Sequence, residues 1–315
     1  MRKLNLAAID IGSNAVRLLI KCVNSDLSEQ PLSKVQLLRV PLRLGEDAFI
    51  SGQISKRKQR DILSLMKVYK HLMKIYDVAH YRACATSAMR EASNADEIVD
   101  KVLRKTGIQI EVISGEEEAA LVAQSKIHRI VTTDRNYLFM DVGGGSTELN
   151  LYVGGEPVAT RSFDIGTVRM LSGVVRDATF EAFDQYLSEL YSQYGAATIV
   201  GTGGNINRLA RINGTTDPSM PDTRFISAEA LQEIYETLAA LTDEQRMTRF
   251  NLKPDRSDVI VPAGELFTRV VAALHADQVI VPTIGVADGI IDQLYLKIMD
   301  YTRIFALGKA TKPVF

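Results

Sequence analysis

The chain of 315 residues contains no tryptophan, and cysteine is nearly absent. Cys22 and Cys84 stand singly in apolar segments without a C-x-x-C pair, so we expect two buried free thiols. Histidine is also scarce, and no histidine has metal-ligand spacing, so each is expected on the surface or in the core. The histidines are His71, His80, His128 and His275.

Long hydrophobic runs are missing too, and neither charge dominates. No apolar segment approaches the length of a membrane span, and Asp10 interrupts the first apolar stretch too early for a signal peptide. The net charge of −1 offers no global attraction for nucleic acid or a membrane. We therefore expect a cytoplasmic protein without either partner, in which a polyanionic substrate would need locally placed cations. With 46% hydrophobic residues, the chain can bury a sizeable core, and its length favours two domains.

The most informative stretch is 138–149, Leu-Phe-Met-Asp-Val-Gly-Gly-Gly-Ser-Thr-Glu-Leu. It predicts a strand, a tight glycine loop and a second strand. Successive N–H groups in such a loop form a concave nest that binds phosphate. Asp141 and Glu148 at the strand ends could hold a divalent cation, directly or through water. The predicted nest residues are Gly143, Gly144, Gly145, Ser146 and Thr147. A glycine-rich hairpin with ordinary polar residues is the alternative interpretation.

Residues 6–19 repeat this pattern of strand, glycine loop and strand, with Asp10 at the end of the first strand and Arg17 in the second. The loop between them contains Gly12, Ser13 and Asn14. Asp10 and Asp141 are 131 positions apart (141 − 10), which suits two duplicated domains. Two glycine hairpins with a carboxylate at each mouth predict a pair of facing phosphate loops.

Elsewhere, strand-like apolar runs alternate with helical periodicity, as is typical of the α/β class. Residues 213–226, rich in Thr, Pro, Asp and Met, are expected to form a long loop. Further strands are expected at 34–44, 80–85, 109–113, 258–262 and 278–282, and helices near 55–76, 86–92, 179–194, 228–241 and 263–275.

Two side chains at predicted strand-to-helix junctions are candidates for chemistry. Arg90 lies in the first turn of the helix after 80–85, where a guanidinium could grip an oxyanion, although a surface salt bridge is equally consistent. In the triplet 116–118, Glu117 has capping-box spacing from Ser114, whereas Glu118 shares a helical face with apolar residues. Burial would raise the pKa of Glu118 and suit it to act as a general base, leaving Glu116 solvated.

A third glycine loop, 201–205, follows a predicted strand and precedes a helix. Its Gly203 and Gly204 are candidates for an anion or nucleotide site, and a plain turn between strand and helix is the alternative.

Taken together, these segments resemble the exopolyphosphatase / guanosine pentaphosphate phosphohydrolase (Ppx/GppA) family of the actin-like ATPase superfamily. The resemblance covers nearly the whole chain. It rests on residues 8–14 with Arg17, and on 85–90, 113–119, 141–149, 201–204 and 256–260.

The resemblance implies two ribonuclease-H-like domains with mixed sheets flanked by helices and a cleft between them. Residues 1–122, joined by a last helix at about 298–315, would form the first domain, and 123–297 the second. It further implies Mg²⁺-dependent release of terminal phosphate, with Glu118 as the catalytic glutamate and Arg90 as the phosphate arginine. Asp141 and Glu148, together with Asp10, would be linked to the metal.

Two departures from the family pattern affect this expectation. Ala287-Asp288-Gly289 replaces the usual Arg-Glu-Gly, which removes a cation from one corner of the cleft. The helical extension of longer relatives is also not expected here, so its grip on long polymers would have to come from elsewhere. The resemblance also suggests a homodimer.

The expected activity is exopolyphosphatase action on inorganic polyphosphate. Guanosine pentaphosphate hydrolysis, an ATP-binding kinase or chaperone-like module, and a binding-only phosphate sensor are the alternatives. The sequence does not determine the preferred chain length or the choice between the two phosphate substrates.

Overall fold

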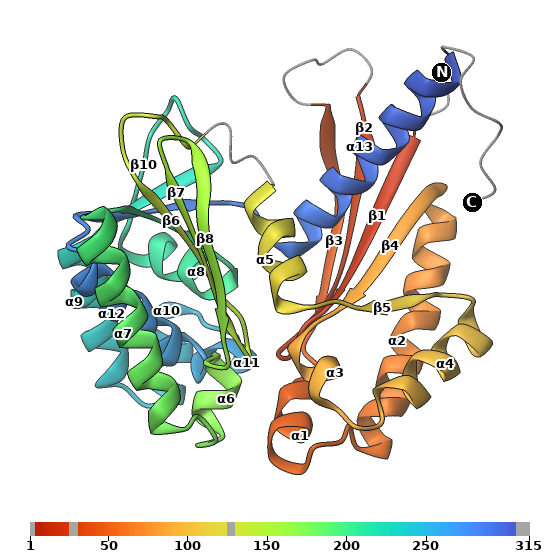
Figure 1. Ribbon diagram of the computed structural model, residues 1–315. Helices are drawn as coiled ribbons and strands as arrows, with labels where there is room; N and C mark the ends of the chain where they lie inside the picture. The colour runs from red at the N-terminus through yellow and green to blue at the C-terminus, as the bar shows by residue number, and fades with distance from the viewer. Residues whose placement is uncertain (1–3, 25–30, 125–129, 307–315) are drawn as a thin grey trace.

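The computed structural model describes residues 4–24, 31–124 and 130–306 and consists of two α/β halves side by side (Figure 1). The first half contains a five-stranded sheet in the order β3-β2-β1-β4-β5. Its elements are β1 (Leu4–Ile11), β2 (Val16–Val23), β3 (Leu32–Val40), α1 (Leu44–Ser51), α2 (Lys56–Ile75), β4 (Val78–Ala85), α3 (Ser87–Glu91), α4 (Ala95–Thr106), β5 (Ile110–Val112) and α5 (Gly115–Gln124).

The second half contains a seven-stranded sheet in the order β10-β11-β12-β9-β6-β7-β8. Its elements are β6 (Tyr137–Val142), β7 (Thr147–Val153), β8 (Glu156–Phe163), α6 (Thr167–Leu171), α7 (Asp177–Tyr194), β9 (Thr198–Thr202), α8 (Gly204–Asn213), β10 (Thr215–Thr216), β11 (Thr223–Ser227), α9 (Ala228–Ala239), α10 (Asp243–Phe250), α11 (Pro254–Ser257), α12 (Ile260–Ala273) and β12 (Gln278–Pro282). The last helix, α13 (Val286–Ala306), follows this sheet in the chain and returns to the first half. Both sheets mix parallel and antiparallel pairs, which confirms the predicted class.

The two halves repeat one topology. In the first sheet, β1 pairs antiparallel with β2 and parallel with β4, and β4 pairs parallel with β5. In the second, β6 pairs antiparallel with β7 and parallel with β9, and β9 pairs parallel with β12. The turns also match, because Gly12 donates to the Ala15 carbonyl at 3.1 Å and Gly143 to the Ser146 carbonyl at 2.9 Å. The two halves therefore correspond down to the hydrogen bond that closes each hairpin turn.

Strand alternation decides which residues face the cleft. Ala7 and Ile9 of β1 pack under α2 and α4, so Asp10, one position on, points to the opposite face. In β6, Leu138 and Met140 belong to the core beneath α7 and α12, so Asp141 also lies on the other face. Both aspartates thereby share the sheet faces on which α5 and α13 pack.

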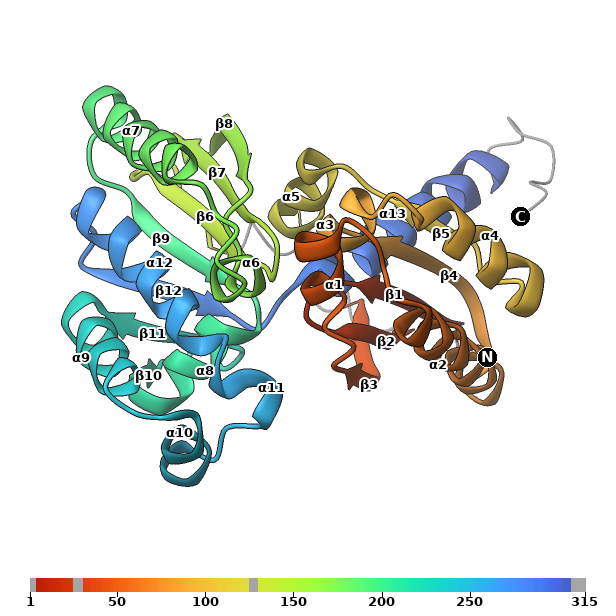
Figure 2. The same ribbon diagram turned by 90° about the horizontal axis from the view of Figure 1, so that it is seen from below.

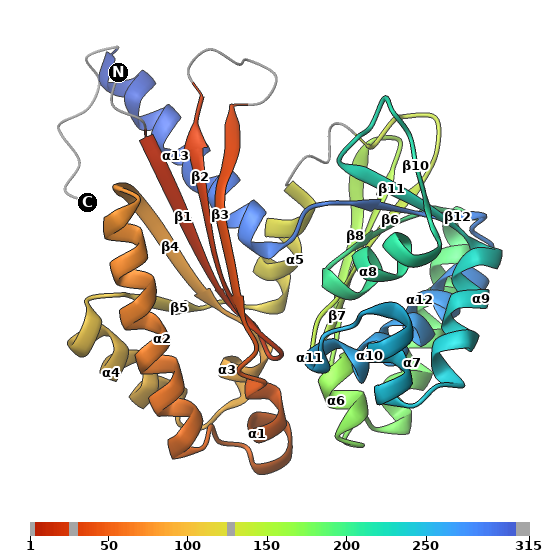
Figure 3. The same ribbon diagram turned by 180° about the vertical axis from the view of Figure 1, so that it is seen from behind.

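The helices α5 and α13 connect the halves by crossing over. α5 follows the first sheet yet packs on β7 and β8, whereas α13 follows the second sheet yet packs on β1, β2 and β4 (Figures 2 and 3). The two helices also touch each other, and Gly289 makes this crossing possible. A Cβ at Gly289 would lie 1.9 Å from the Leu121 carbonyl oxygen.

Three local expectations were wrong. Residues 258–262 are not a strand, because Ile260 begins α12 and Pro262 fits its first turn, where a missing N–H costs nothing. Residues 213–226 are not a loop throughout, because β10 and β11 form a hairpin that extends the sheet beside β12. The strand expected at 34–44 ends at Val40, and α1 follows.

The final helix α13 begins at Val286 and includes the first part of the segment 298–315, of which residues 307–315 lie outside the described part of the chain. Within the described ranges, no helix combines the length and apolar character needed to cross a bilayer.

Replacing Gly289 by alanine should lower the free energy of unfolding by about 1–3 kcal/mol, because the added methyl collides with a backbone atom of α5 that cannot rotate away. Gly285→Ala is the matched control, since nothing lies within 4 Å of a Cβ there. Thermal unfolding of the two variants gives the comparison. Equal melting temperatures would show that the helix crossing tolerates a wider separation.

Candidate active site

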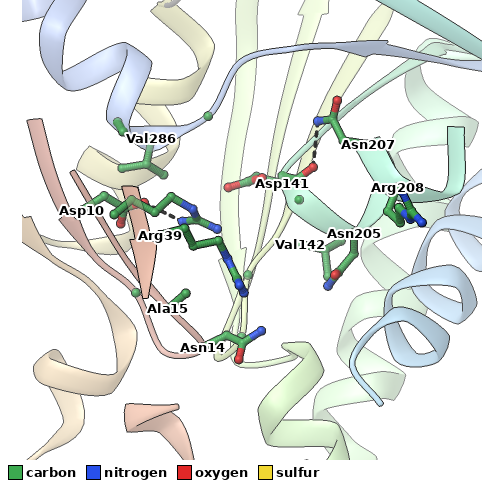
Figure 4. Close-up of a pocket in the computed structure, with 18 of the residues that line it drawn as sticks. Asp10, Asn14, Ala15, Arg39, Asp141, Val142, Asn205, Asn207, Arg208 and Val286 are labelled. Carbon is green, nitrogen blue, oxygen red and sulfur yellow. Dashed lines mark hydrogen bonds and ion pairs between the residues drawn. The ribbon is translucent and has the colours of Figure 1, made fainter. Parts of the chain in front are cut away.

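A cleft of about 600 Å³ lies between the two halves (Figure 4). Both glycine hairpins, the third glycine loop and the start of α5 contribute to its walls. The predicted site residues that line it are Asp10, Gly12, Ser13, Asn14, Arg17, Glu118, Asp141, Gly143, Gly144, Ser146, Gly203 and Gly204. Arg90, Gly145, Thr147 and Glu148 are not part of its lining.

The two hairpin loops touch directly. A Cβ at Gly144 would lie 2.9 Å from the Ser13 Cβ and 3.2 Å from the Asn14 nitrogen, so only glycine permits this approach. Ser13 also has a structural task, because its Oγ lies 2.7 Å from the Ser87 Oγ and accepts from the Ala88 N–H at 3.2 Å. The loops and the start of α3 therefore form one continuous polar floor.

Cross-strand pairing brings different partners to the two hairpin mouths. In the first hairpin Asp10 stands opposite Arg17, and their side chains form an ion pair of 2.6 Å. In the second hairpin Asp141 stands opposite Glu148. The Thr202 hydroxyl donates to Asp141 at 2.8 Å, and the Ser162 hydroxyl donates to Glu148 at 3.0 Å. The first mouth is neutralised internally, and the second holds two acids.

Glu118 is buried at the cleft wall and is only 7% exposed. Burial raises its pKa well above the usual range, and the nearby Glu148, Asp141 and Asp10 carboxylates add to this effect. Arg90 opposes the shift, and its guanidinium lies 3.7 Å from Glu118 while donating to the Ile113 carbonyl at 2.8 Å. Arg90 thus reaches the predicted base although it does not line the cleft.

Glu148 shares this environment. Burial and the Asp141 carboxylate raise its pKa to about 7, and burial likewise raises the pKa of Asp141. One buried oxygen of Glu118 and one of Glu148 accept no hydrogen bond. Buried acceptors without donors are costly, and this pair marks a place where a cation or its bound water would fit.

No group of three or more acidic, histidine or cysteine side chains within the described ranges is close enough to hold a metal ion unaided. The carboxylates Asp10, Asp141 and Glu148 therefore form no complete protein cage. Their donor set suits Mg²⁺ in its common mode, in which one or two carboxylates bind and water and substrate phosphate complete the octahedron.

The three consecutive glutamates occupy different environments. Glu116 is exposed. Glu117 receives an ion pair from Arg82 at 2.6 Å, and its N–H donates to the Ser114 hydroxyl at 3.1 Å. Only Glu118 lines the cleft.

Most of the cations of the cleft were not among the site residues predicted from the sequence. They are Lys34, Arg39, Arg208, Arg211, Lys253 and Arg256. Strand register could have found Arg39, because it pairs with Arg17 across β2 and β3. Arg256 lies in α11, whose packing no pattern indicated. Burial and the neighbouring Arg39 and Arg17 lower the pKa of Arg256 to about 10, a direct sign of crowded positive charge.

At the start of α13, where Ala287 and Asp288 replace the usual Arg-Glu, Asp288 forms an ion pair. The Lys21 ammonium lies 2.8 Å from Asp288 and 3.6 Å from Asp292. Asp288 also accepts from the Gly285 N–H at 3.1 Å at the start of α13. Ala287 lines the cleft, which leaves this corner without a side-chain charge from that position.

Duplicated α/β halves, paired glycine hairpins at the base of a basic cleft and crossing helices define a protein of the actin-like ATPase type. The family comparison is more specific: residues 23–298 match the model of the Ppx/GppA phosphatase family. The chain belongs to that family, as the motifs predicted.

Similar proteins extend this result. Exopolyphosphatase 2 of Mycobacterium tuberculosis is 27% identical over 310 residues, covering 90% of this chain and 97% of the relative. A guanosine-5'-triphosphate,3'-diphosphate pyrophosphatase of Aliivibrio fischeri is 32% identical over 220 residues, covering 65% of this chain and 43% of the relative. The crystal structure of the Aquifex aeolicus family member has a TM-score of 0.75 at 26% identity, covering 94% of this chain and 98% of that one.

The raised pKa of Glu148 predicts a pH-dependent effect of Glu148→Gln on stability. A carboxyl with a folded pKa of about 7 stabilises the fold fully below its unfolded pKa, and this contribution is lost as the pH rises through 7. Glutamine keeps the neutral form, so the variant should be more stable than the parent by about 1–3 kcal/mol at alkaline pH. The difference should largely vanish at acidic pH.

Denaturant unfolding with a chelator present, on either side of neutrality, provides the measurement. Glu156→Gln, at an exposed position of the adjacent strand β8, serves as the control and should show no such change. A Glu148→Gln effect of the same size at both pH values would contradict the assignment.

Proposed function

We propose that the protein hydrolyses terminal phosphate from inorganic polyphosphate. The observation that carries this proposal is the buried Glu118 oxygen without a donor, beside two phosphate loops in contact. The mycobacterial exopolyphosphatases, similar over about nine-tenths of this chain, support the same substrate class.

In this proposal Glu118 accepts a proton from the attacking water, or orients that water, for in-line displacement at the terminal phosphorus. Burial raises the pKa of Glu118, so its ionised form is a stronger proton acceptor than a solvated carboxylate. Arg90 pairs with the Glu118 carboxylate at 3.7 Å and would stabilise negative charge that develops there. Backbone N–H groups of the two glycine loops would cradle the terminal phosphate.

The divalent cation of this reaction would be Mg²⁺, held through Asp141 and Glu148, with Asp10 on the opposite hairpin. When bound, it would neutralise phosphate oxygens during transfer. Three clustered arginines would bind the polyphosphate at the phosphates that follow the terminal one. They are Arg17, Arg39 and Arg256.

Guanosine pentaphosphate is the second candidate substrate. The guanosine-5'-triphosphate,3'-diphosphate pyrophosphatase relatives point to it, and so does an apolar side of the cleft that could receive a base. That side is lined by Leu19, Leu37, Ile284 and Val286.

Glu118→Gln should lower kcat by two or more orders of magnitude, because it removes the proton acceptor while keeping the side-chain shape. Glu116→Gln, two residues earlier on the exposed side of α5, is the matched control and should keep its activity. Phosphate release from polyphosphate is the measurement. An unchanged kcat in Glu118→Gln would remove this residue from the chemistry.

The substrate and the metal are tested in one assay set. Phosphate release is measured from polyphosphate, guanosine pentaphosphate and ATP, each with Mg²⁺ and with a chelator. We expect Mg²⁺-dependent release, fastest from polyphosphate. Binding without release from any of the three would identify a phosphate sensor instead.

A further inference from the structure

An ion pair spans the cleft beside the clustered arginines. Arg39 of β3, in the first half, donates to the Asp255 carboxylate of α11, in the second half. Both side chains are largely buried, at 18% and 13% exposure. The Asn14 amide of the first phosphate loop also donates to the Asp255 carbonyl at 3.3 Å. Asp255 is thus fixed to a phosphate loop and to a cation of the cleft.

Arg39 lies among like charges. It stands opposite Arg17 in the β2–β3 register, and both oppose the charge of Arg256. Arg17 already has Asp10 at 2.6 Å, and Arg256 donates to the Gly204 carbonyl at 2.7 Å. Asp255 is the carboxylate that neutralises Arg39 at this point.

Arg39 and Asn14 also retain unused hydrogen-bonding capacity. The Arg39 Nε and the Asn14 Oδ1 are buried without partners within the described part of the chain. Arg39 projects into the cleft on the side where Asn14 lies (Figure 4). A guanidinium that keeps a free Nε beside the cleft can bind a phosphate edge with two parallel N–H donors.

We propose that Asp255 is a built-in competitor for the substrate, occupying Arg39 until a phosphate beyond the terminal one displaces it. This inference rests on the proposed function and adds to it a residue that determines specificity. A polyphosphate chain carries charge on every phosphate, so it can satisfy Arg39 together with Arg17 and Arg256. A single phosphate in the terminal position cannot reach all three. The ion pair therefore lowers the affinity for chains and leaves the affinity for orthophosphate unchanged.

The residue that follows the same short helix supplies a matched control. Asp258, three positions after Asp255, pairs with Arg43 at 2.6 Å with similar exposure of both side chains. This second ion pair also spans the two halves, but Arg43 does not line the cleft. Asp258→Asn therefore removes the same charge and a comparable tie between the halves, without freeing a cation of the cleft.

The experiment measures binding of tripolyphosphate and of orthophosphate by calorimetry, on the full chain with a chelator present. Asp255→Asn should lower the dissociation constant for tripolyphosphate by about five- to tenfold, since substrate no longer displaces a carboxylate. Orthophosphate affinity should change less than twofold. Asp258→Asn should leave both constants within about twofold, which is the range of a general change in field.

The double variant Arg39→Gln/Asp255→Asn tests whether the gain in tripolyphosphate affinity depends on Arg39. Once Arg39 is glutamine, Asp255→Asn should give no further gain. Persistence of the gain in that background, an equal gain in Asp258→Asn, or no gain in Asp255→Asn would each overturn the proposal. If Asp255→Asn does not fold, Arg39→Gln alone decides, because it must weaken tripolyphosphate binding more than orthophosphate binding.

Binding without metal requires no turnover, so this test is independent of the proposed hydrolysis. If the variants bind tripolyphosphate as predicted but the protein releases no phosphate, the proposal for Asp255 stands and the proposed hydrolysis is wrong. A protein that hydrolyses polyphosphate with unchanged binding in Asp255→Asn would show the reverse.

Discussion

The contact between two glycine hairpins is the constraint on which the rest of the structure depends. At Gly144 the second hairpin approaches Ser13 and Asn14 so closely that a methyl group would collide with both. This contact fixes the floor of the cleft and brings the strand ends of both sheets together. A second close approach, of Gly289 to Leu121, holds α13 against α5. Glycine at both contacts lets the backbone segments approach closely, and this fixes the position of one sheet relative to the other.

Crowded charge follows from this proximity. Buried carboxylates on one side raise one another's pKa values, whereas arginines on the other side lower the pKa of Arg256. The two groups balance each other only in part, through the ion pairs of Asp10 with Arg17 and of Asp255 with Arg39. The cleft stores two unfavourable arrangements that a cation and a polyanion would relieve together. A chain with a net charge of −1 can therefore hold a strongly polarised site.

Local patterns revealed much of this arrangement, and long-range packing decided the remainder. The repeated Asp-x-Gly grammar predicted both hairpins because the glycines and the strand periodicity are local signals. Helix phase separated Glu118 from Glu116 for the same reason. Arg256 belongs to the segment 256–260 that carries the family resemblance, but its place in the cleft could not be predicted, because α11 has four residues and its position depends on Arg39 and Arg43 from the other half. The apolar run before Pro262 misled for a related reason: its β-branched residues favour a strand locally, while burial in the core stabilises a helix.

The duplication also shows where equivalent positions of the two halves carry different charges. Equivalent positions seven residues after the hairpin aspartates (17 − 10 and 148 − 141) hold Arg17 in one half and Glu148 in the other. The first hairpin thus neutralises its own aspartate and offers a cation to an anionic ligand. The second hairpin accumulates two carboxylates, one of which leaves a buried oxygen without a donor. A divalent cation would be redundant at the first mouth and would relieve repulsion at the second, so this one exchange of charge makes the half that carries Asp141 the better place for a cation.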